Sequence, residues 1–164
     1  MPRRPRPSGA TAAIRALEQA GVDFVLHPYE HDPRATSYGV EAAQVLGIPE
    51  ARVFKTLVAD ADGRLVVAVV PVSGLLDLKA LARALGARRA AMADPGAAER
   101  ATGYVVGGIS PLGQKRPHPT VLDASALGHE TVLVSAGRRG LDVELAPAEL
   151  VTLTSAQVAA IAQA

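Results

Sequence analysis

The most informative run of the sequence is Arg52-Val53-Phe54-Lys55-Thr56-Leu57-Val58-Ala59, which holds one ammonium group among β-branched and apolar residues. It contains no glycine or proline and therefore predicts a β-strand. Strand alternation places Lys55 on one face together with Val53 and Leu57. A lysine in such a strand either extends to solvent or is held in a cleft. In a cleft, desolvation lowers its pKa and makes it a donor, a base or a nucleophile.

Length and composition limit the class of protein. The 164 residues suffice for one domain with a sizeable core, and 49% hydrophobic with 20% charged residues is ordinary for a globular chain. Cysteine is absent, which excludes disulfides and a cysteine nucleophile. No apolar run approaches the roughly 18 residues that span a bilayer, so no membrane association is expected. We expect a cytoplasmic protein with a disordered basic tail at residues 1–9 and a single domain at residues 10–164.

Charge gives little support for a protein that grips nucleic acid by itself. The net charge is only +1, and aromatic residues make up 3% of the chain. Phosphate binding depends on clustered Lys and Arg, and base stacking depends on aromatic side chains. Composition therefore does not by itself indicate a nucleic-acid-binding protein.

Helices and strands follow one another without regular βαβ alternation. Caps and glycine stops predict helices from Thr11 to near Ala20, from Thr36 or Ser37 to Gly47, from Leu78 to Leu85, from Pro95 to Gly103 and from Pro147 through Leu150, then a tail helix that Ser155 caps. Strands are predicted at 22–27, 52–59, 65–72, 88–92, from Tyr104, and at 120–123, 131–135 and 141–145. The predicted fold class is α+β, with a mixed, mainly antiparallel sheet and short helices packed around it.

A second informative segment is Tyr104-Val105-Val106-Gly107-Gly108-Ile109-Ser110-Pro111-Leu112-Gly113-Gln114-Lys115. Its glycines leave backbone N–H groups open to carbonyl, carboxylate or phosphate oxygens, although glycines also make ordinary turns. The spacing matches no nucleotide-binding fingerprint. His27 and His31 lack a third ligand at a zinc-like spacing, so we expect neither a metal nor a cofactor.

The segments that carry most information are residues 27–33, 52–57, 76–79, 102–115 and 134–141. Together they resemble the YbaK/EbsC family of aminoacyl-tRNA deacylases, over nearly the whole chain from Thr11 to Ile161. The resemblance implies trans-editing, in which Cys-tRNA(Pro) or Cys-tRNA(Cys) is hydrolysed after a charging error. Binding alone separates small side chains poorly, so a second, hydrolytic site corrects the error. The implied partners are aminoacyl-tRNA, with its 3′ end in the pocket, and prolyl-tRNA synthetase.

The resemblance also implies the site residues. Lys55 matches the essential side chain, and Gly107 matches a glycine that lines the pocket through its backbone. The residues implied to surround the substrate are Tyr29, Tyr38, Thr56, Gly108, Ile109, Ser110, Ser135 and Asp142. The implied nucleophile is the substrate's own cysteine thiol. Lys55 would orient the substrate and stabilise negative charge, and N–H groups from Gly107 to Ser110 would act as oxyanion donors.

Three alternatives remain open from the sequence. The chain could be a non-catalytic module that binds tRNA or a synthetase, which a deacylation assay would reveal. It could be a deacylase for a different small amino acid, with water as nucleophile and Lys55 as base. A lysine Schiff-base enzyme is the third, and borohydride trapping would identify it.

Overall fold

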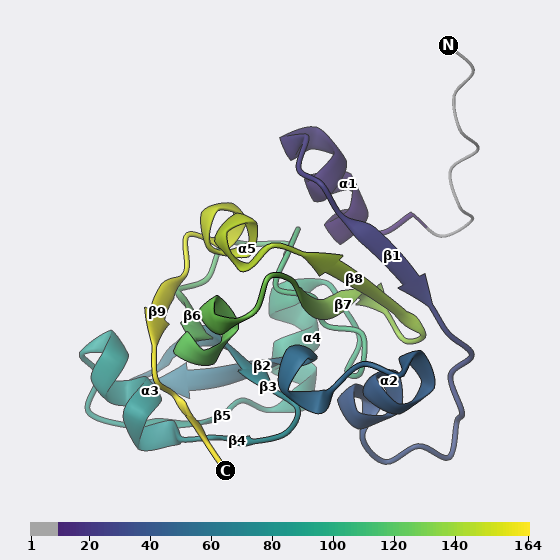
Figure 1. The fold of residues 1–164 in the computed structure, drawn as a ribbon. Coiled ribbons are helices and arrows are strands. Elements are labelled where there is room, and N and C mark those ends of the chain that lie inside the picture. The colour runs from purple at the N-terminus through teal and green to yellow at the C-terminus, as the bar shows by residue number, and fades with distance from the viewer. Residues whose placement is uncertain (1–9) are drawn as a thin grey trace.

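The computed structural model describes residues 10–164 (Figure 1). The predicted basic tail at residues 1–9 therefore lies outside the described residues. The helices are α1 (Ala12–Ala20), α2 (Tyr38–Leu46), α3 (Leu78–Leu85), α4 (Pro95–Thr102) and α5 (Pro147–Thr154), with 3₁₀ segments η1 (Glu50–Arg52) and η2 (Ala124–Gly128). Within this part of the chain, none of the helices has the length and apolar character that crossing a membrane requires.

The strands form two main sheets and a small pair. They are β1 (Val25–Pro28), β2 (Phe54–Ala61), β3 (Arg64–Pro71), β4 (Leu75–Leu76), β5 (Ala90–Met92), β6 (Thr120–Asp123), β7 (Val132–Arg138), β8 (Leu141–Leu145), β9 (Gln157–Ala159) and β10 (Ala162–Gln163). The larger sheet has the order β5-β2-β3-β6-β9, the smaller has β1-β8-β7, and β10 pairs with β4. Among the strand pairs of residues 10–164, β3–β6 and β6–β9 are parallel and the others are antiparallel. The predicted α+β class with a mainly antiparallel sheet is confirmed.

The β2–β3 hairpin is the centre of the larger sheet. Its turn places Asp62 and Gly63 at φ values of 53° and 88°, and Asp60 Oδ1 accepts a hydrogen bond from the Gly63 amide at 2.7 Å. Alternation along β2 sends Phe54 into one hydrophobic cluster and Leu57 against another. Both faces of the hairpin are therefore covered, as the apolar sequence of β3 predicts.

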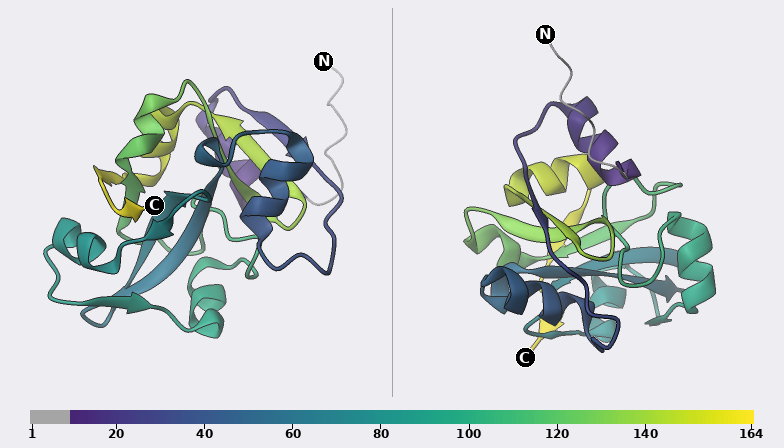
Figure 2. Two further views of the ribbon diagram at one scale, coloured as in Figure 1. Left: turned by 60° about the horizontal axis from the view of Figure 1, so that its bottom comes forward. Right: turned by 90° about the vertical axis from the view of Figure 1, so that its right-hand side faces the viewer.

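The two main sheets pack face to face around one core. In the right-hand view of Figure 2 the yellow-green strands of the smaller sheet lie above the blue strands of the larger one. Fully buried side chains from both sheets meet between them, namely Val67, Val69, Leu122, Val132, Val134 and Val143. An isolated parallel bridge between Val53 and Leu133 joins the sheets at the start of β2.

Two local predictions are wrong. No strand begins at Tyr104, because its amide donates to Thr102 Oγ1 and its hydroxyl donates to the Leu112 carbonyl at 2.6 Å, which fixes a compact loop. The tail is β9 and β10 rather than a helix, and Ser155 ends α5 instead of capping a new helix. Asp123 Oδ1 accepts hydrogen bonds from the amides of Ile161 and Ala162, so long-range contacts override the local helical pattern.

Candidate active site

The outer edge of β2 is unpaired over part of its length. The Val53 carbonyl accepts from Val72 on the β3 side, whereas the Val58 carbonyl accepts from Ala93 on the opposite side. Because backbone groups alternate along a strand, the N–H and C=O of Thr56 face the same outer edge as those of Val58. Among the described residues, β7 reaches this edge only at Val53, and β5 pairs only from Ala59 onward. A gap in the sheet therefore lies between the two strands.

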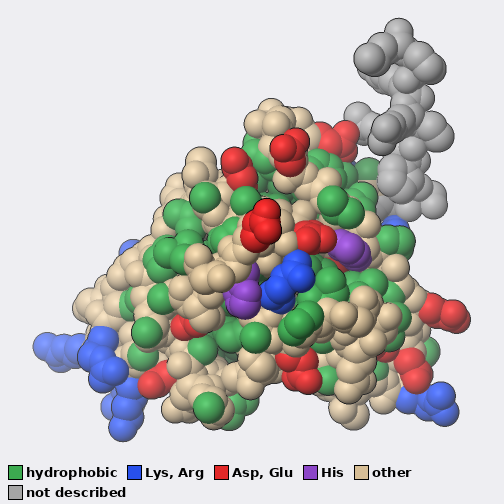
Figure 3. Space-filling view, in the orientation of Figure 1, with side chains coloured by type: hydrophobic (Ala, Val, Ile, Leu, Met, Phe, Trp, Pro, Cys, Tyr) green, Lys and Arg blue, Asp and Glu red, His purple; other side chains and the backbone are tan. Residues whose placement is uncertain are grey.

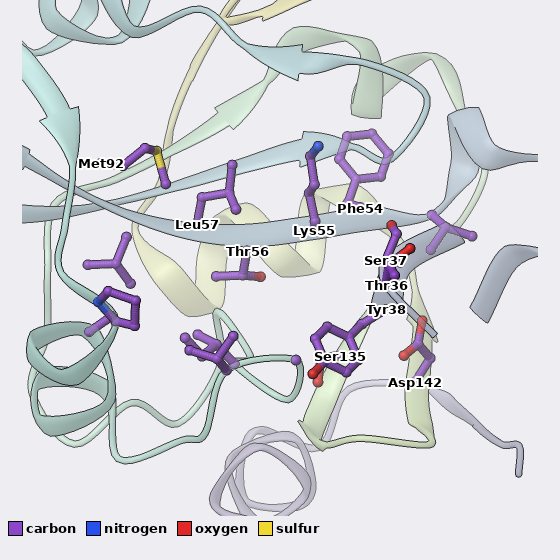
Figure 4. A pocket seen from close by; sticks show the side chains of 18 of the residues that line it. Thr36, Ser37, Tyr38, Phe54, Lys55, Thr56, Leu57, Met92, Ser135 and Asp142 are labelled. Atoms are coloured by element: carbon purple, nitrogen blue, oxygen red, sulfur yellow. The ribbon is translucent and has the colours of Figure 1, made fainter. Parts of the chain in front are cut away.

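A cavity of about 370 Å³ occupies this gap. Its volume falls within the range of roughly 300–1,000 Å³ that is typical of small-molecule sites. Lys55 and Thr56 leave β2 on opposite sides (Figure 4) and both line the cavity, so the cavity follows the strand's edge. The predicted site residues in the lining are Tyr29, Tyr38, Lys55, Thr56, Gly107, Ile109, Ser135 and Asp142.

Lys55 is half-buried, and desolvation lowers the pKa of its ammonium group. No carboxylate of the described residues lies within ion-pair distance of its ammonium, and no hydrogen bond there involves it. A cation without a partner in an apolar-walled cavity is available to bind a carbonyl oxygen or a developing negative charge. Lys55 is therefore half-buried at the free edge of β2 and lines the cavity there, which is nearer to the cleft case than to full exposure to solvent.

Asp142 contributes a buried carboxyl group to the same cavity. It lies opposite Ser135 in the β7–β8 ladder and is only 6% exposed. Burial raises the pKa of Asp142 to about 7. Tyr29 is itself partly buried, and this burial together with the nearby Asp142 charge raises the pKa of Tyr29 to about 12. This tyrosine therefore stays a neutral donor. A cationic group placed in the cavity would favour the ionised form of Asp142.

Thr56 has the one buried side-chain oxygen that finds no hydrogen-bond partner among the described residues. Buried hydroxyl groups are normally hydrogen-bonded, and leaving one unpaired is costly. The hydroxyl lines the cavity beside the free edge of its own strand. A polar ligand group in the cavity would satisfy both the hydroxyl and the unpaired backbone.

The glycine loop is held rigid by hydrogen bonds to its neighbours. Glu99 Oε2 accepts from the Val106 amide at 2.8 Å, and the Ser110 carbonyl accepts from Gln114 Nε2 at 3.0 Å. Gly107 has φ +89°, and a Cβ there would lie 2.8 Å from Tyr38 Cζ and 2.9 Å from Arg139 Nε. Only glycine fits both the backbone conformation and the space at this position.

Two predicted site residues do not line the cavity. The Gly108 amide donates to the Val105 carbonyl at 2.8 Å, so it is already used within the loop. Ser110 is fully buried, and its hydroxyl accepts from the Leu112 amide at 3.2 Å. The structure thus gives both residues contacts that shape the loop, and leaves Gly107 and Ile109 to face the cavity.

The start of α2 forms one side of the cavity mouth. Ser37 caps the helix by accepting from the Val40 amide. Glu41, 8% exposed, accepts from His31 Nδ1 at 2.7 Å and from the Asp32 amide at 2.8 Å, which ties the preceding loop to the helix. These contacts place Tyr38 over the loop at Gly107.

Sequence reasoning missed the apolar wall of the cavity. This wall comes from the end of β5 and from α4, and consists of Met92, Ala93, Pro95 and Ala98. Asp94 and Pro95 did predict the start of a helix, and Asp94 does cap α4. Nothing local showed that this helix would line the same cavity as β2, because that placement is set by the pairing of β5 with β2.

The two histidines of the proline-rich segment bind different carboxylates. His27 Nε2 lies 2.7 Å from Glu144 Oε1, whereas His31 contacts Glu41. Arg52 also contacts Glu144, at 3.0 Å, and this cluster joins β1 to β8 and η1. Residues 10–164 contain no group of three or more His, Asp or Glu side chains arranged to hold a metal ion.

The raised pKa of Asp142 predicts a pH-dependent stability. Its folded pKa of about 7 exceeds the ordinary 3.8, so the unfolded chain binds fewer protons between these values and stability falls as pH rises from about 4 to about 7. The shift corresponds to a cost of about 4 kcal/mol above pH 7. Asp142→Asn is therefore expected to raise the free energy of unfolding at pH 8 and to change it little at pH 4, measured by urea titration.

The matched control for that experiment is Asp23→Asn, because Asp23 is exposed. The control variant should follow the pH dependence of the unsubstituted protein. Equal stability of Asp142→Asn and the unsubstituted protein at pH 8 would contradict the prediction.

The fold matches that of known editing proteins, and the sequence identifies the family. A family model described as "Aminoacyl-tRNA editing domain" matches residues 31–153. The chain belongs to this family, which confirms the resemblance to YbaK/EbsC proteins seen in the sequence. The expected enzyme class, an aminoacyl-tRNA deacylase, is confirmed at the level of the family.

Two of the relatives described next cover more than nine-tenths of the chain, and a third covers about half of it. A candidate Cys-tRNA(Pro)/Cys-tRNA(Cys) deacylase, EbsC of Enterococcus faecalis, is 40% identical over 152 residues, or 92% of each chain. A crystal structure of a candidate trans-editing enzyme for prolyl tRNA synthetase matches with TM-score 0.81 and 29% identity, over 96% of this chain and 100% of that one. A proline–tRNA ligase of Acidithiobacillus ferrooxidans is 38% identical over 88 residues, which are 54% of this chain and 15% of the ligase.

Proposed function

We propose that this chain removes cysteine from mischarged Cys-tRNA(Pro) by cleaving the ester between the amino acid and the terminal ribose. One observation carries the proposal: the unpaired Lys55 ammonium and the buried Asp142 carboxyl line one small cavity beside a rigid glycine loop. Similarity to a protein described as a Cys-tRNA(Pro)/Cys-tRNA(Cys) deacylase supports this substrate class.

The cavity offers a partner for each polar group of an aminoacyl ester. The Asp142 carboxylate would bind the α-ammonium, which would replace the proton that burial otherwise keeps on this group. The Thr56 hydroxyl and the free backbone edge of β2 supply further hydrogen bonds. The apolar wall from Met92 to Ala98 would receive a small side chain and excludes water around it.

The proposed nucleophile is the substrate's own thiol. Its sulfur forms a bond to the ester carbonyl carbon, the bond from that carbon to the ribose oxygen breaks, and the thiol proton ends on the ribose hydroxyl. Water then opens the cyclic thioester to free cysteine. An intramolecular attack gains from effective molarity, so the protein needs only to orient the group and stabilise charge. The Gly107 N–H would stabilise the negative oxygen from the glycine loop, and the Lys55 ammonium, which leaves β2 on the side opposite Thr56, would act across the free edge of the strand.

Prolyl-tRNA synthetase is the proposed partner. The chain's net charge of +1 gives it little general attraction for RNA. A synthetase that holds the tRNA body would present its 3′ end to the cavity. The similarity between part of this chain and part of a proline–tRNA ligase is consistent with a shared substrate.

The test is a panel of tRNAs carrying cysteine, alanine, serine or proline, incubated with the purified chain, with and without prolyl-tRNA synthetase. Cysteinyl esters are expected to be cleaved at least about 100-fold faster than the others, because only cysteine carries the thiol. Equal cleavage of alanyl and cysteinyl esters would show that water, and not the substrate thiol, is the nucleophile, with Lys55 as its base. Binding without any hydrolysis would make the chain a non-catalytic module.

A further inference from the structure

Arg139 is an exposed residue between β7 and β8 whose guanidinium is nonetheless fixed in place. Its Cζ lies 5.0 Å from the centre of the Tyr38 ring, and its Nε donates to the Val106 carbonyl at 2.9 Å. Tyr38 in turn packs at a tilt against His31, with ring centres 5.5 Å apart. A long surface side chain held by a ring and a carbonyl loses little further freedom when it binds a ligand.

The fixed guanidinium stands at the mouth of the cavity. Tyr38, Val106 and Gly107 all line the cavity, and Arg139 contacts the first two. A Cβ on Gly107 would lie 2.9 Å from Arg139 Nε, which shows how closely the guanidinium approaches the loop. The rim group, defined as Tyr38, Gly107 and Arg139, therefore joins α2, the glycine loop and the β7–β8 turn.

The terminal nitrogens of Arg139 remain available. Among the residues that the structure describes, no carboxylate lies within ion-pair distance of them, and Glu99 is held by the Val106 amide instead. A planar guanidinium binds phosphate through two parallel hydrogen bonds. Other basic side chains gather over α3, where Lys79 and Arg83 are exposed (Figure 3), but α3 contributes no residue to the cavity.

We propose that Arg139, held against Tyr38, binds the phosphodiester that precedes the terminal nucleoside of the acyl-RNA. This inference rests on the proposed function, because it takes the aminoacyl group as the occupant of the cavity. With that group inside, the ester and its ribose stand at the mouth, and the first phosphate of the RNA is the next charged group outward. The rim group thereby separates an amino acid on RNA from a free amino acid ester.

The experiment uses two stable ligands in which an amide replaces the ester. One is a CCA trinucleotide carrying cysteine, and the other is the corresponding cysteinyl adenosine without phosphate. Arg139→Gln is expected to raise the Kd of the trinucleotide about 10-fold and to change the Kd of the nucleoside by no more than about twofold. The slope of log Kd against log salt concentration for the trinucleotide is expected to fall by about 0.7, as for one lost contact to single-stranded RNA.

Two further variants complete the design. Arg139→Lys keeps the charge and is expected to restore the salt slope without the full affinity. Arg64→Gln removes an exposed arginine from β3, which has no residue in the cavity, and is expected to change neither ligand's binding. Unchanged binding of the trinucleotide to Arg139→Gln, or equal weakening of both ligands, would overturn the inference. The proposed function is judged separately, by hydrolysis of Cys-tRNA(Pro).

Discussion

Replacing Lys55 with alanine is expected to lower kcat/KM for Cys-tRNA(Pro) at least about 100-fold, a loss comparable to that of one oxyanion-stabilising donor. The reason is that Lys55 is the one cation among the described residues lining the cavity, and the guanidinium of Arg139 at the mouth is held by Tyr38 and the Val106 carbonyl, so it would not replace the ammonium. Initial rates of release of labelled cysteine from Cys-tRNA(Pro) measure the effect.

The same substitution should not weaken the fold. Within the described residues the ammonium makes no hydrogen bond and no ion pair, so alanine leaves no partner unsatisfied. Lys79→Ala is the matched control, because Lys79 is exposed on α3, outside the cavity. Deacylation by Lys55→Ala at the unsubstituted rate would show that the assigned role of Lys55 is wrong.

Replacing Gly107 with alanine is expected to reduce deacylation about 100-fold or more and to destabilise the protein by about 1–3 kcal/mol. Alanine is strained at φ +89°, and its Cβ would meet the Tyr38 ring and the Arg139 guanidinium at 2.8–2.9 Å. The loop must then move, and the Gly107 N–H moves with it. Activity assays and urea unfolding measure the two effects.

Two other glycines separate the causes of that loss. Gly63 has nearly the same φ, +88°, but a Cβ there would meet nothing within 4 Å. Gly63→Ala therefore reports the backbone strain alone and should leave activity intact. Gly128 has neither a positive φ nor a close neighbour, so Gly128→Ala should be neutral. Full activity in Gly107→Ala would refute the assigned role of this loop.

The sequence predicts those parts of the fold that local chemistry controls. Thr11 and Gly21 bound α1, and Asp77 and Gly86 bound α3, because a side-chain oxygen and a left-handed glycine satisfy the helix ends. The prediction of a helix in the tail fails because Asp123 binds the tail's backbone from about 40 residues away in the sequence. Its Oδ1 accepts hydrogen bonds from the amides of Ile161 and Ala162. No window of the tail contains that information.

The site likewise has features that the sequence predicts and features that only the fold shows. The lysine in an apolar strand and the glycine loop are visible in the sequence, and both line the cavity. The unpaired edge of β2 is not visible, because it depends on where β5 and β7 stop pairing. The contact of Arg139 with Tyr38 joins residues about 100 positions apart, and only the folded chain brings them together.

The interruption along β2 also determines how the cavity's dimensions respond to substitution. The unpaired edge of β2 runs over four residues, from Phe54 to Leu57, which is roughly 13 Å of extended chain. Main-chain pairing bounds it at each end. Exchanging side chains can deepen or fill this space but cannot lengthen it. Accepting a longer aminoacyl group would require β5 or β7 to change register, which would move its whole pattern of inward and outward residues.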